Sequence, residues 1–376
     1  MTGKAASNKE TKENARDVAL RLATQEEKRR KSDPHESREK SLIVLGSREV
    51  GKTTMIYRFL EKEDTPKPTL AMDYAYGRKA GKNLVKDIVH VWEIGHLTPS
   101  LVSAAMKGCC LSHSPHHTTV LLVLDLGKPE TLWNTLEDCL EALQKGMEMS
   151  YPRELIEQVL NEKLRGLAER SGGQQQSPQQ AVDEMSEPFP LRLCLVGGRY
   201  DEFRGTDADD REFMGRALRA AAHALAASLH YHSAKDAQLL RRSKDMLSNY
   251  GFKGQSPKTT VIDHEKPLSV AAGADSFASI ELYDRPAATA ALSLEEIKRI
   301  YVTRFPQRAR DQEDQRTSSD GANYDRDDDL EHLANDESFA EPIIDRLVLQ
   351  REEEISVLMH DMQETPTTNI PIPDPY

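Results

Sequence analysis

The sequence predicts an α/β protein in which a mostly parallel sheet is covered by helices on both faces, with flexible charged arms at the two ends. Short apolar runs recur along the chain, and stretches of helical character lie between them. Runs that are apolar throughout are typical of strands buried on both faces of a parallel sheet. Alternation of strands and helices favours crossover connections, which place helices on both sides of that sheet.

Four apolar runs are the expected strands, in chain order SLIVLG (41–46), DIVHVWEI (87–94), TTVLLVLDL (118–126) and LRLCLVGG (191–198). The expected helices lie at 51–62, 129–149, 152–170, 212–227 and 293–305. Leucines recur at helical spacing in the second of these helices, and the fourth is rich in alanine, the strongest helix former. These segments justify the predicted alternation of strands and helices.

Composition divides the 376 residues into a central domain and flanking segments. They are a charged N-terminal arm (1–40), a domain (41–306) with a low-complexity insertion near 171–187, an acidic linker (307–340), a helix (341–362) and an extended proline-rich tail (363–376). The first arm has a net charge of +3 and residues 311–376 have −15, so the middle of the chain is neutral. An apolar stripe on the C-terminal helix predicts an interaction face.

The charge distribution and the cysteines exclude several classes of protein. A neutral core with an acidic tail disfavours binding to nucleic acid, and it also disfavours direct contact with microtubules, which are themselves acidic. No apolar run approaches the roughly 20 residues of a membrane helix, so no membrane insertion is expected. Four cysteines without a C-x-x-C pair do not form a disulfide framework. We expect a soluble protein of the reducing cytoplasm.

The segment GSREVGKT (46–53) fits the phosphate-loop pattern G-x-x-x-x-G-K-[ST] between a predicted strand and a predicted helix. Gly46 and Gly51 let the backbone wrap a phosphate, which also meets the positive N-terminus of the helix. Lys52 is expected to reach the β- and γ-phosphates, and Thr53 to offer its hydroxyl to Mg²⁺. A structural turn that binds nothing is the alternative interpretation.

Further stations of a nucleotide switch, that is, the motifs that bind the metal, position water and bind the base, follow in chain order. Thr69 lies where a second threonine would reach Mg²⁺, although an ordinary surface threonine fits equally well. The segment Trp92–Leu97 stands where D-x-x-G is expected, and it allows two registers. In one, Glu93 replaces the Asp and Leu97 replaces the water-orienting Gln; in the other, Gly95 is the Gly and Trp92 replaces the Asp. Either register argues against efficient hydrolysis.

The base-binding station is partial. Asp201 ends the segment GRYD (198–201), where N-K-x-D is expected, and it keeps only the Asp. Ser233, Ala234 and Lys235 match the S-A-K sequence that lies behind a guanine base. Asp125 ends its strand like an Mg²⁺-binding Asp, although capping the next helix is the favoured interpretation. The sequence therefore predicts a site for GTP, GDP or another nucleotide with magnesium, with an intact phosphate end and a degraded hydrolytic centre, unless the loop is a structural turn. No enzyme is expected beyond weak hydrolysis of a nucleoside triphosphate.

Six segments in this order resemble one family: GSREVGKTT, PKPTLAMDYAYGRKAG, DIVHVWEIG, LVLDLGKPETLW, PFPLRLCLVGGRYDEF and KPLSVAAGADSF. They look like the light intermediate chain of cytoplasmic dynein, most of all the ciliary dynein 2 type. The resemblance implies a Ras-like P-loop domain in a non-motor subunit that binds the dynein 2 heavy chain alongside the other dynein 2 subunits. It also implies a role with the intraflagellar transport machinery in retrograde transport and cilium assembly, and location in the cytoplasm, cilium and cytoskeleton. The phosphate-loop residues implied are Gly46, Gly51, Lys52, Thr53 and Thr54.

Two alternatives stay open. The light intermediate chain of cytoplasmic dynein 1 carries cargo adaptors through a C-terminal helix with paired aromatic residues, whereas here Phe339 stands alone. That difference favours the ciliary type. The second alternative is a nucleotide-dependent switch of the small-GTPase class, supported by the phosphate loop together with Thr69, Asp201 and the S-A-K segment.

Overall fold

The computed structural model describes residues 38–80, 86–108, 115–170, 187–252, 260–282 and 292–308, and most positions between 342 and 355. The predicted N-terminal arm up to residue 37, most of the insertion, most of the acidic linker and the proline-rich tail lie outside the described residues. The chain divides into two units, Met1–Glu313 and Asp314–Tyr376, each of which is considered by itself.

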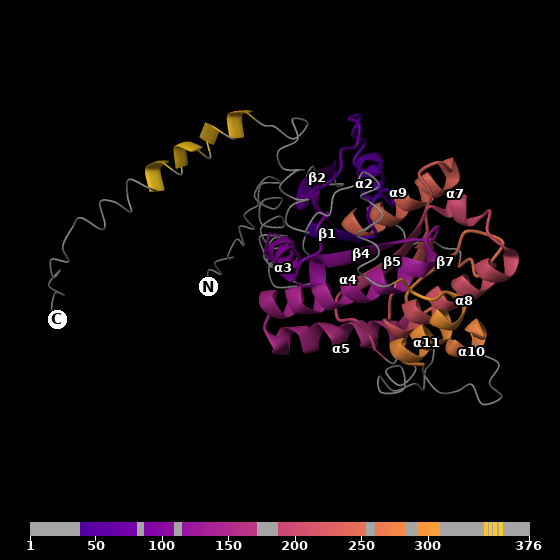
Figure 1. Cartoon of the computed structure of the whole chain (residues 1–376). Coiled ribbons are helices and arrows are strands. Elements are labelled where there is room, and N and C mark those ends of the chain that lie inside the picture. The colour runs from indigo at the N-terminus through magenta and orange to yellow at the C-terminus, as the bar shows by residue number, and fades with distance from the viewer. Residues whose placement is uncertain are drawn as a thin grey trace, which may run out of the picture. The chain divides into compact units, whose positions relative to one another are not determined.

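A seven-stranded sheet forms the centre of the first unit, in the order β2-β3-β1-β4-β5-β6-β7 (Figure 1). The strands are β1 (Glu39–Gly46), β2 (Met72–Ala80), β3 (Lys86–Ile94), β4 (Thr118–Asp125), β5 (Arg192–Gly198), β6 (Ser228–Tyr231) and β7 (Ser269–Val270). The five inner strands are parallel, and β2 and β7 pair antiparallel at the two edges. The mostly parallel sheet is confirmed.

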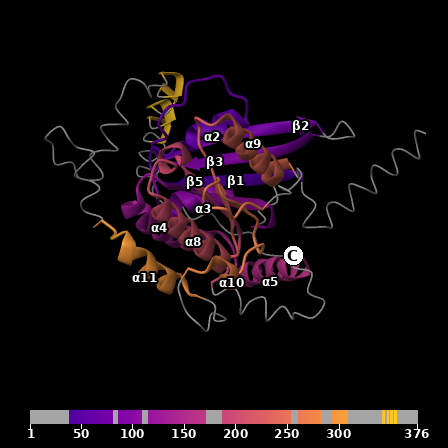
Figure 2. The ribbon, with the colours of Figure 1, turned by 90° about the vertical axis from the view of Figure 1, so that its right-hand side faces the viewer.

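Helices cover both faces of this sheet, as Figure 2 shows from the side. They are α2 (Lys52–Phe59), α3 (Pro99–Lys107), α4 (Pro129–Ser150), α5 (Arg153–Arg170), α7 (Tyr200–Phe203), α8 (Ala208–Ala224), α9 (Ala237–Phe252), α10 (Phe277–Ile280) and α11 (Leu294–Arg304). Alternate residues of β1 point into two apolar clusters: Ile43 and Leu45 join one with α3, α4 and α8, and Leu42 and Val44 join the other with α2 and α9. This alternation explains why the strand reads as continuously apolar.

The predicted strands and helices agree with the structure to within a few residues at their ends. The structure adds the strands β2, β6 and β7 and the helices α3, α7, α9 and α10. The second apolar cluster includes Met246 and Leu247 of α9. These two apolar residues are separated by polar ones from Leu239, so the helical period is weak in the sequence. Among the described residues, no helix is both long enough and apolar enough to span a membrane.

The last described residues of the first unit pack against the N-terminal end of α4. Tyr301 of α11 is fully buried, and its hydroxyl donates a hydrogen bond to the Pro129 carbonyl at 2.9 Å. The Gln307 side-chain oxygen accepts hydrogen bonds from the backbone N–H groups of Trp133 and Asn134, at 3.0 and 3.3 Å. Ordered packing therefore continues past Pro306, where the sequence predicted the end of the domain.

The second unit contributes a helical segment, and its described residues lie between 342 and 355. Its large apolar side chains are exposed: Ile343, Ile344, Leu347, Leu349 and Ile355. These residues lie in the segment where the sequence predicts an interaction face, and that face stays a prediction.

Candidate functional site

The phosphate loop connects β1 to α2, and its two glycines adopt backbone conformations that other residues rarely take. Gly46 has φ of 130°, and a Cβ atom there would lie 2.0 Å from the Val123 carbonyl oxygen of the neighbouring strand β4. Gly51 has φ of 96° and precedes the first residue of α2, with open space around its Cα. The loop therefore folds tightly against β4 and leaves the helix N-terminus open.

Lys52 lies at the centre of this loop and is buried. Its Nζ atom donates hydrogen bonds to the backbone oxygens of Gly46 and Ser47, at 3.1 and 2.7 Å. Burial lowers the pKa of this amine, and the negative charge of Glu93 opposes that effect. Thr54, also expected at the site, is half-buried in the first turn of α2. The residues present fit a phosphate group, since an amine and a helix N-terminus meet at the loop.

Thr53, Thr69 and Glu93 meet beside the loop, although up to 40 residues separate them in the chain. The Thr53 hydroxyl donates to Glu93 Oε1 at 2.7 Å, and Thr69 contributes a side-chain hydrogen bond to the same carboxylate. Burial raises the pKa of Glu93, and the hydrogen bonds from Thr53 and Thr69 and the charge of Lys52 oppose that rise. The sequence placed Thr53 and Thr69 near one metal, and the structure brings them to one carboxylate.

The hydrogen bond between Thr53 and Glu93 decides between the two registers of the D-x-x-G motif, because it places the Glu93 carboxylate beside the phosphate loop. Successive strand residues point to opposite faces, so Trp92 lies on the other face, where its ring is 4.6 Å from that of Tyr74. Glu93 therefore stands at the Asp position, and Leu97 stands where the water-orienting Gln is expected. Leu97 packs against the larger apolar cluster, so the side chain at this position is apolar.

Gly95 holds the Thr69 segment against the end of β3. A Cβ atom at Gly95 would lie 1.9 Å from the Thr69 carbonyl oxygen. The backbone N–H groups of Gly95 and His96 both donate to the Ala71 carbonyl, at 3.0 and 3.2 Å. These protein contacts therefore hold this segment close to the end of β3.

Asp125 and Arg199 join the phosphate loop to the base-binding end. Asp125 Oδ1 accepts a hydrogen bond from the Gly127 N–H at 2.9 Å, which turns the chain after β4. The N-cap residue of α4 is Lys128, without a side-chain capping hydrogen bond, so the expectation that Asp125 caps this helix is wrong. Arg199 lies 3.6 Å from Asp125 Oδ2 and donates to the Glu49 carbonyl of the phosphate loop at 3.0 Å. Arg199 stands in the GRYD segment (198–201) at the position of the Lys of N-K-x-D, and the sequence did not predict this bridge. Arg199 directly follows a predicted strand, and this position is the signal in the sequence that could have indicated a contact with the phosphate loop.

The base-binding residues also come together. Ser233 Oγ donates to Asp201 Oδ1 at 2.6 Å, and Lys235 Nζ lies 2.7 Å from Asp201 Oδ2. Burial alone would raise the pKa of Asp201, but the hydrogen bonds from Lys235 and Ser233 lower it overall. Ala234 lies between these two partners and is exposed. The carboxylate is therefore ionised and oriented by the S-A-K segment.

Gly198 occupies the position of the missing Asn, and the loop leaves little room for a side chain there. A Cβ atom at Gly198 would lie 2.5 Å from Cγ2 of Val50 in the phosphate loop. Glycine in place of the Asn therefore allows the phosphate loop to pack closely against β5.

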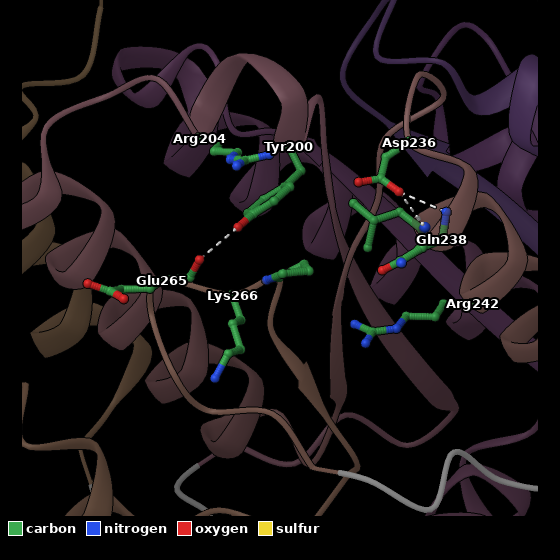
Figure 3. Close-up of a pocket in the computed structure, with 9 residues that line it drawn as sticks. Tyr200, Arg204, Asp236, Gln238, Arg242, Glu265 and Lys266 are labelled. Carbon is green, nitrogen blue, oxygen red and sulfur yellow. Dashed lines mark hydrogen bonds between the residues drawn. The ribbon is translucent and has the colours of Figure 1, made fainter.

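A polar pocket of about 220 Å³ adjoins the base-binding residues (Figure 3). It is lined by Tyr200, Arg204, Asp236, Gln238, Leu239, Arg242, Glu265, Lys266 and Pro267. The Tyr200 ring points across it, and its hydroxyl donates to the Glu265 carbonyl at 3.5 Å. Asp236 accepts from the N–H groups of Gln238 and Leu239, at 2.8 and 3.2 Å, and so caps α9. Three basic and two acidic side chains line the pocket, so groups of both signs are present.

Comparison with known proteins gives a consistent set of relatives. No model of a known protein family matches the chain. A cytoplasmic dynein 2 light intermediate chain 1 from Danio rerio is 30% identical over 346 residues, which are 88% of each chain. The protein of that name from Homo sapiens is 36% identical over 66% of this chain and 69% of its own, and that from Mus musculus is 32% identical over 88% and 91%.

A solved structure shares the fold. The crystal structure of the dynein light intermediate chain's conserved domain superposes with a TM-score of 0.53 at 16% identity, covering 70% of this chain and 97% of that one. Sheet order, phosphate loop and base-binding station define a P-loop GTPase-like domain. On the similarity of its sequence to the relatives above, the chain belongs to the cytoplasmic dynein 2 light intermediate chain family.

Proposed function

We infer that this chain is a non-catalytic accessory subunit of the cytoplasmic dynein 2 motor. It binds the dynein 2 heavy chain together with other subunits of that motor and works with the intraflagellar transport machinery. In this role it supports retrograde intraflagellar transport and cilium assembly. Its sites of action are the cytoplasm and the base and axoneme of the cilium.

One observation carries this proposal: similarity to dynein 2 light intermediate chains extends over 88% of the chain. The altered hydrolytic station supports a non-catalytic role. Leu97 packs in an apolar cluster instead of orienting water, and positioned water supplies much of the rate of GTP hydrolysis.

Purification from ciliated cells tests the proposal. The full-length chain carrying a tag is expressed in cells whose own copy is deleted, and the proteins that come down with it are identified by mass spectrometry. We expect the dynein 2 heavy chain in the eluate and restored cilium length. Normal cilia in the deleted cells, or a set of partners that never includes a dynein heavy chain, would contradict the proposal.

We further propose that the phosphate loop binds GTP or GDP with magnesium and holds it without turnover. Gly46, Gly51, Lys52, Thr53 and Thr54 would surround the phosphates, Thr53 and Thr69 would face the metal, and Asp201 with Ser233, Ala234 and Lys235 would meet the base. A ligand bound only by the native state stabilises the fold. Nucleotide content of the purified chain, measured by chromatography after denaturation, tests this proposal, and an empty chain that gains no thermal stability from GDP contradicts it.

A nucleotide-dependent switch is the second candidate, favoured by the intact contacts among Asp201, Ser233 and Lys235. It predicts that different partners are recovered with GTP and with GDP. The Lys52→Ala variant separates the two candidates. A static role predicts unchanged recovery of the heavy chain as long as the variant folds, whereas a switch predicts loss of one set of partners.

A further inference from the structure

We propose that the nucleotide site does not select guanine and binds adenine and guanine nucleotides with similar affinity, because Lys235 pairs with Asp201, the carboxylate that would select the base. The proposal rests on the nucleotide binding inferred above, and it adds ADP and ATP to the ligands of that site. It departs from the guanine selectivity that a GTPase-like fold leads one to expect.

Both oxygens of the Asp201 carboxylate already have a partner in the protein. Ser233 Oγ donates to Oδ1 at 2.6 Å, and Lys235 Nζ lies 2.7 Å from Oδ2. A guanine base is selected by a carboxylate that accepts from its two N–H donors, N1–H and the 2-amino group. Here those donors would have to share Asp201 with a cation that is already bound to it.

Lys235 also changes what the site offers to the edge of a base. An ammonium group only donates hydrogen bonds and a carboxylate only accepts them, so the pair of Lys235 and Asp201 offers one donor and one acceptor. Guanine matches this pair through its O6 acceptor and its N1–H donor. Adenine matches it equally through its N1 acceptor and its 6-amino donor. The pair therefore gives no reason to reject either purine.

The exposure of the pair weakens selection further. The Lys235 side chain is 74% exposed and that of Asp201 is 24% exposed. A binding site rejects a wrong ligand strongly only when that ligand leaves buried polar groups of the site unpaired. Because water reaches both groups, a base that matches them poorly leaves neither of them without a partner.

The position of the missing Asn contributes no side chain to the base either. Gly198 stands there, and a Cβ atom would lie 2.5 Å from Cγ2 of Val50 in the phosphate loop. Affinity then comes mainly from the phosphates, which meet Lys52 and the N-terminus of α2. Since the phosphates are the same in ADP and GDP, the two nucleotides should bind alike.

Competition against a fluorescent nucleotide tests the proposal on the purified full-length chain. GDP with an N-methylanthraniloyl group on its ribose is bound first and is then displaced by GDP or by ADP, which gives the ratio of their affinities. Lys235→Met removes the ammonium group and keeps the apolar stem. Lys244→Met is the matched control, since Lys244 is another exposed lysine and pairs instead with Glu61.

We expect the affinities of GDP and ADP to agree within about ten-fold in the wild type and in Lys244→Met. Lys235→Met should shift the ratio toward GDP by at least about ten-fold, because both N–H donors of guanine then meet a carboxylate without a competing cation. Melting curves show that each variant is folded. A wild type that prefers GDP by more than ten-fold overturns the proposal, and so does a folded Lys235→Met variant with the wild-type ratio.

The outcomes separate this proposal from nucleotide binding itself. If GDP displaces the fluorescent nucleotide and ADP does not, nucleotide binding stands and the lack of selectivity fails. If the fluorescent nucleotide does not bind and neither GDP nor ADP raises the melting temperature, both proposals fail.

Discussion

Gly46 shows at the scale of one residue how the phosphate loop depends on the strand beside it. Its φ is 130°, and a side chain would have no room, because its Cβ atom would lie 2.0 Å from the Val123 carbonyl oxygen. We expect Gly46→Ala to lower the free energy of unfolding by at least about 2 kcal/mol, because the backbone must move away from β4. Thermal or urea unfolding of the full-length chain measures this change.

Gly166 in α5 provides the control for that substitution. Nothing lies within 4 Å of a Cβ atom there, and its backbone is helical. Gly166→Ala is expected to stabilise the chain by roughly 0.5–1 kcal/mol, because glycine weakens a helix. Equal effects of the two substitutions would contradict the packing argument.

Lys163 of α5 is the residue whose ionisation should affect stability near neutral pH. Its Nζ atom donates to the Phe189 and Leu191 carbonyls, at 2.7 and 3.1 Å, and burial lowers its pKa from 10.5 to about 7. Between pH 7 and 10.5 the unfolded chain then holds a proton that the folded chain has lost. The contribution of Lys163 to stability should therefore increase with pH in that window, by at most about 5 kcal/mol.

The pH dependence is measured as the difference between the wild type and Lys163→Met, which removes the titrating amine and keeps the apolar stem. The free energy of unfolding of the wild type should rise relative to the variant between pH 7 and 10. A constant difference across that window would show that the folded-state pKa of Lys163 is near its ordinary value.

At the scale of secondary-structure elements, one buried ion pair fixes α8 to the loop that leads into α10. Arg219 and Asp275 are 3% and 6% exposed and form two hydrogen bonds, at 2.7 and 2.8 Å. Asp275 also accepts from Ser279 Oγ at 2.6 Å. Asp275 lies in the KPLSVAAGADSF segment on which the family resemblance partly rests, so that segment has a structural role here.

Removing one partner should leave the other charge buried. Asp275→Ala is expected to destabilise the chain by about 3–5 kcal/mol, because Arg219 would lose both acceptors. Asp263→Ala is the control, since Asp263 forms an exposed pair with Lys266 and exposed pairs contribute little to stability. Chemical denaturation of both variants checks the prediction, and similar losses would contradict it.

The N-terminal end of α4 depends on residues more than 170 positions later in the chain. Gln307 accepts from the N–H groups of Trp133 and Asn134 and donates to the Pro129 carbonyl at 3.0 Å. Gln307→Ala should cost about 1–2 kcal/mol, as the loss of a helix cap does. Gln144→Ala on the exposed face of α4 is the control and should change stability by less than about 0.5 kcal/mol. Unfolding curves that match for the two variants would contradict the capping role.

At the scale of the whole molecule, most of the fold was predictable. The strands at 41–46, 87–94, 118–126 and 191–198 are apolar throughout because they lie between two layers of helices, and the structure confirms them. The edges were less predictable. The antiparallel direction of β2 depends on pairing with β3 across a short connection, and that direction leaves no trace in hydrophobic periodicity.

The candidate site was predictable where its residues are close in sequence. The phosphate loop lies in eight consecutive residues, so its motif states the geometry directly. Glu93 and Arg199 act across the sheet, on Thr53 and Glu49, so only the tertiary structure shows those contacts.

The sequence by itself determined the four apolar strands, the helices at 51–62, 129–149, 152–170, 212–227 and 293–305, the phosphate loop and the family. Periodicity, turn residues and motifs are properties of neighbouring positions. The tertiary structure alone decided that Glu93 stands at the Asp position, that Arg199 joins the two ends of the site and that Arg219 holds Asp275. These contacts link residues 40 to 150 positions apart. Such pairs form only when the strands take their places in the sheet, since that packing sets which distant side chains meet.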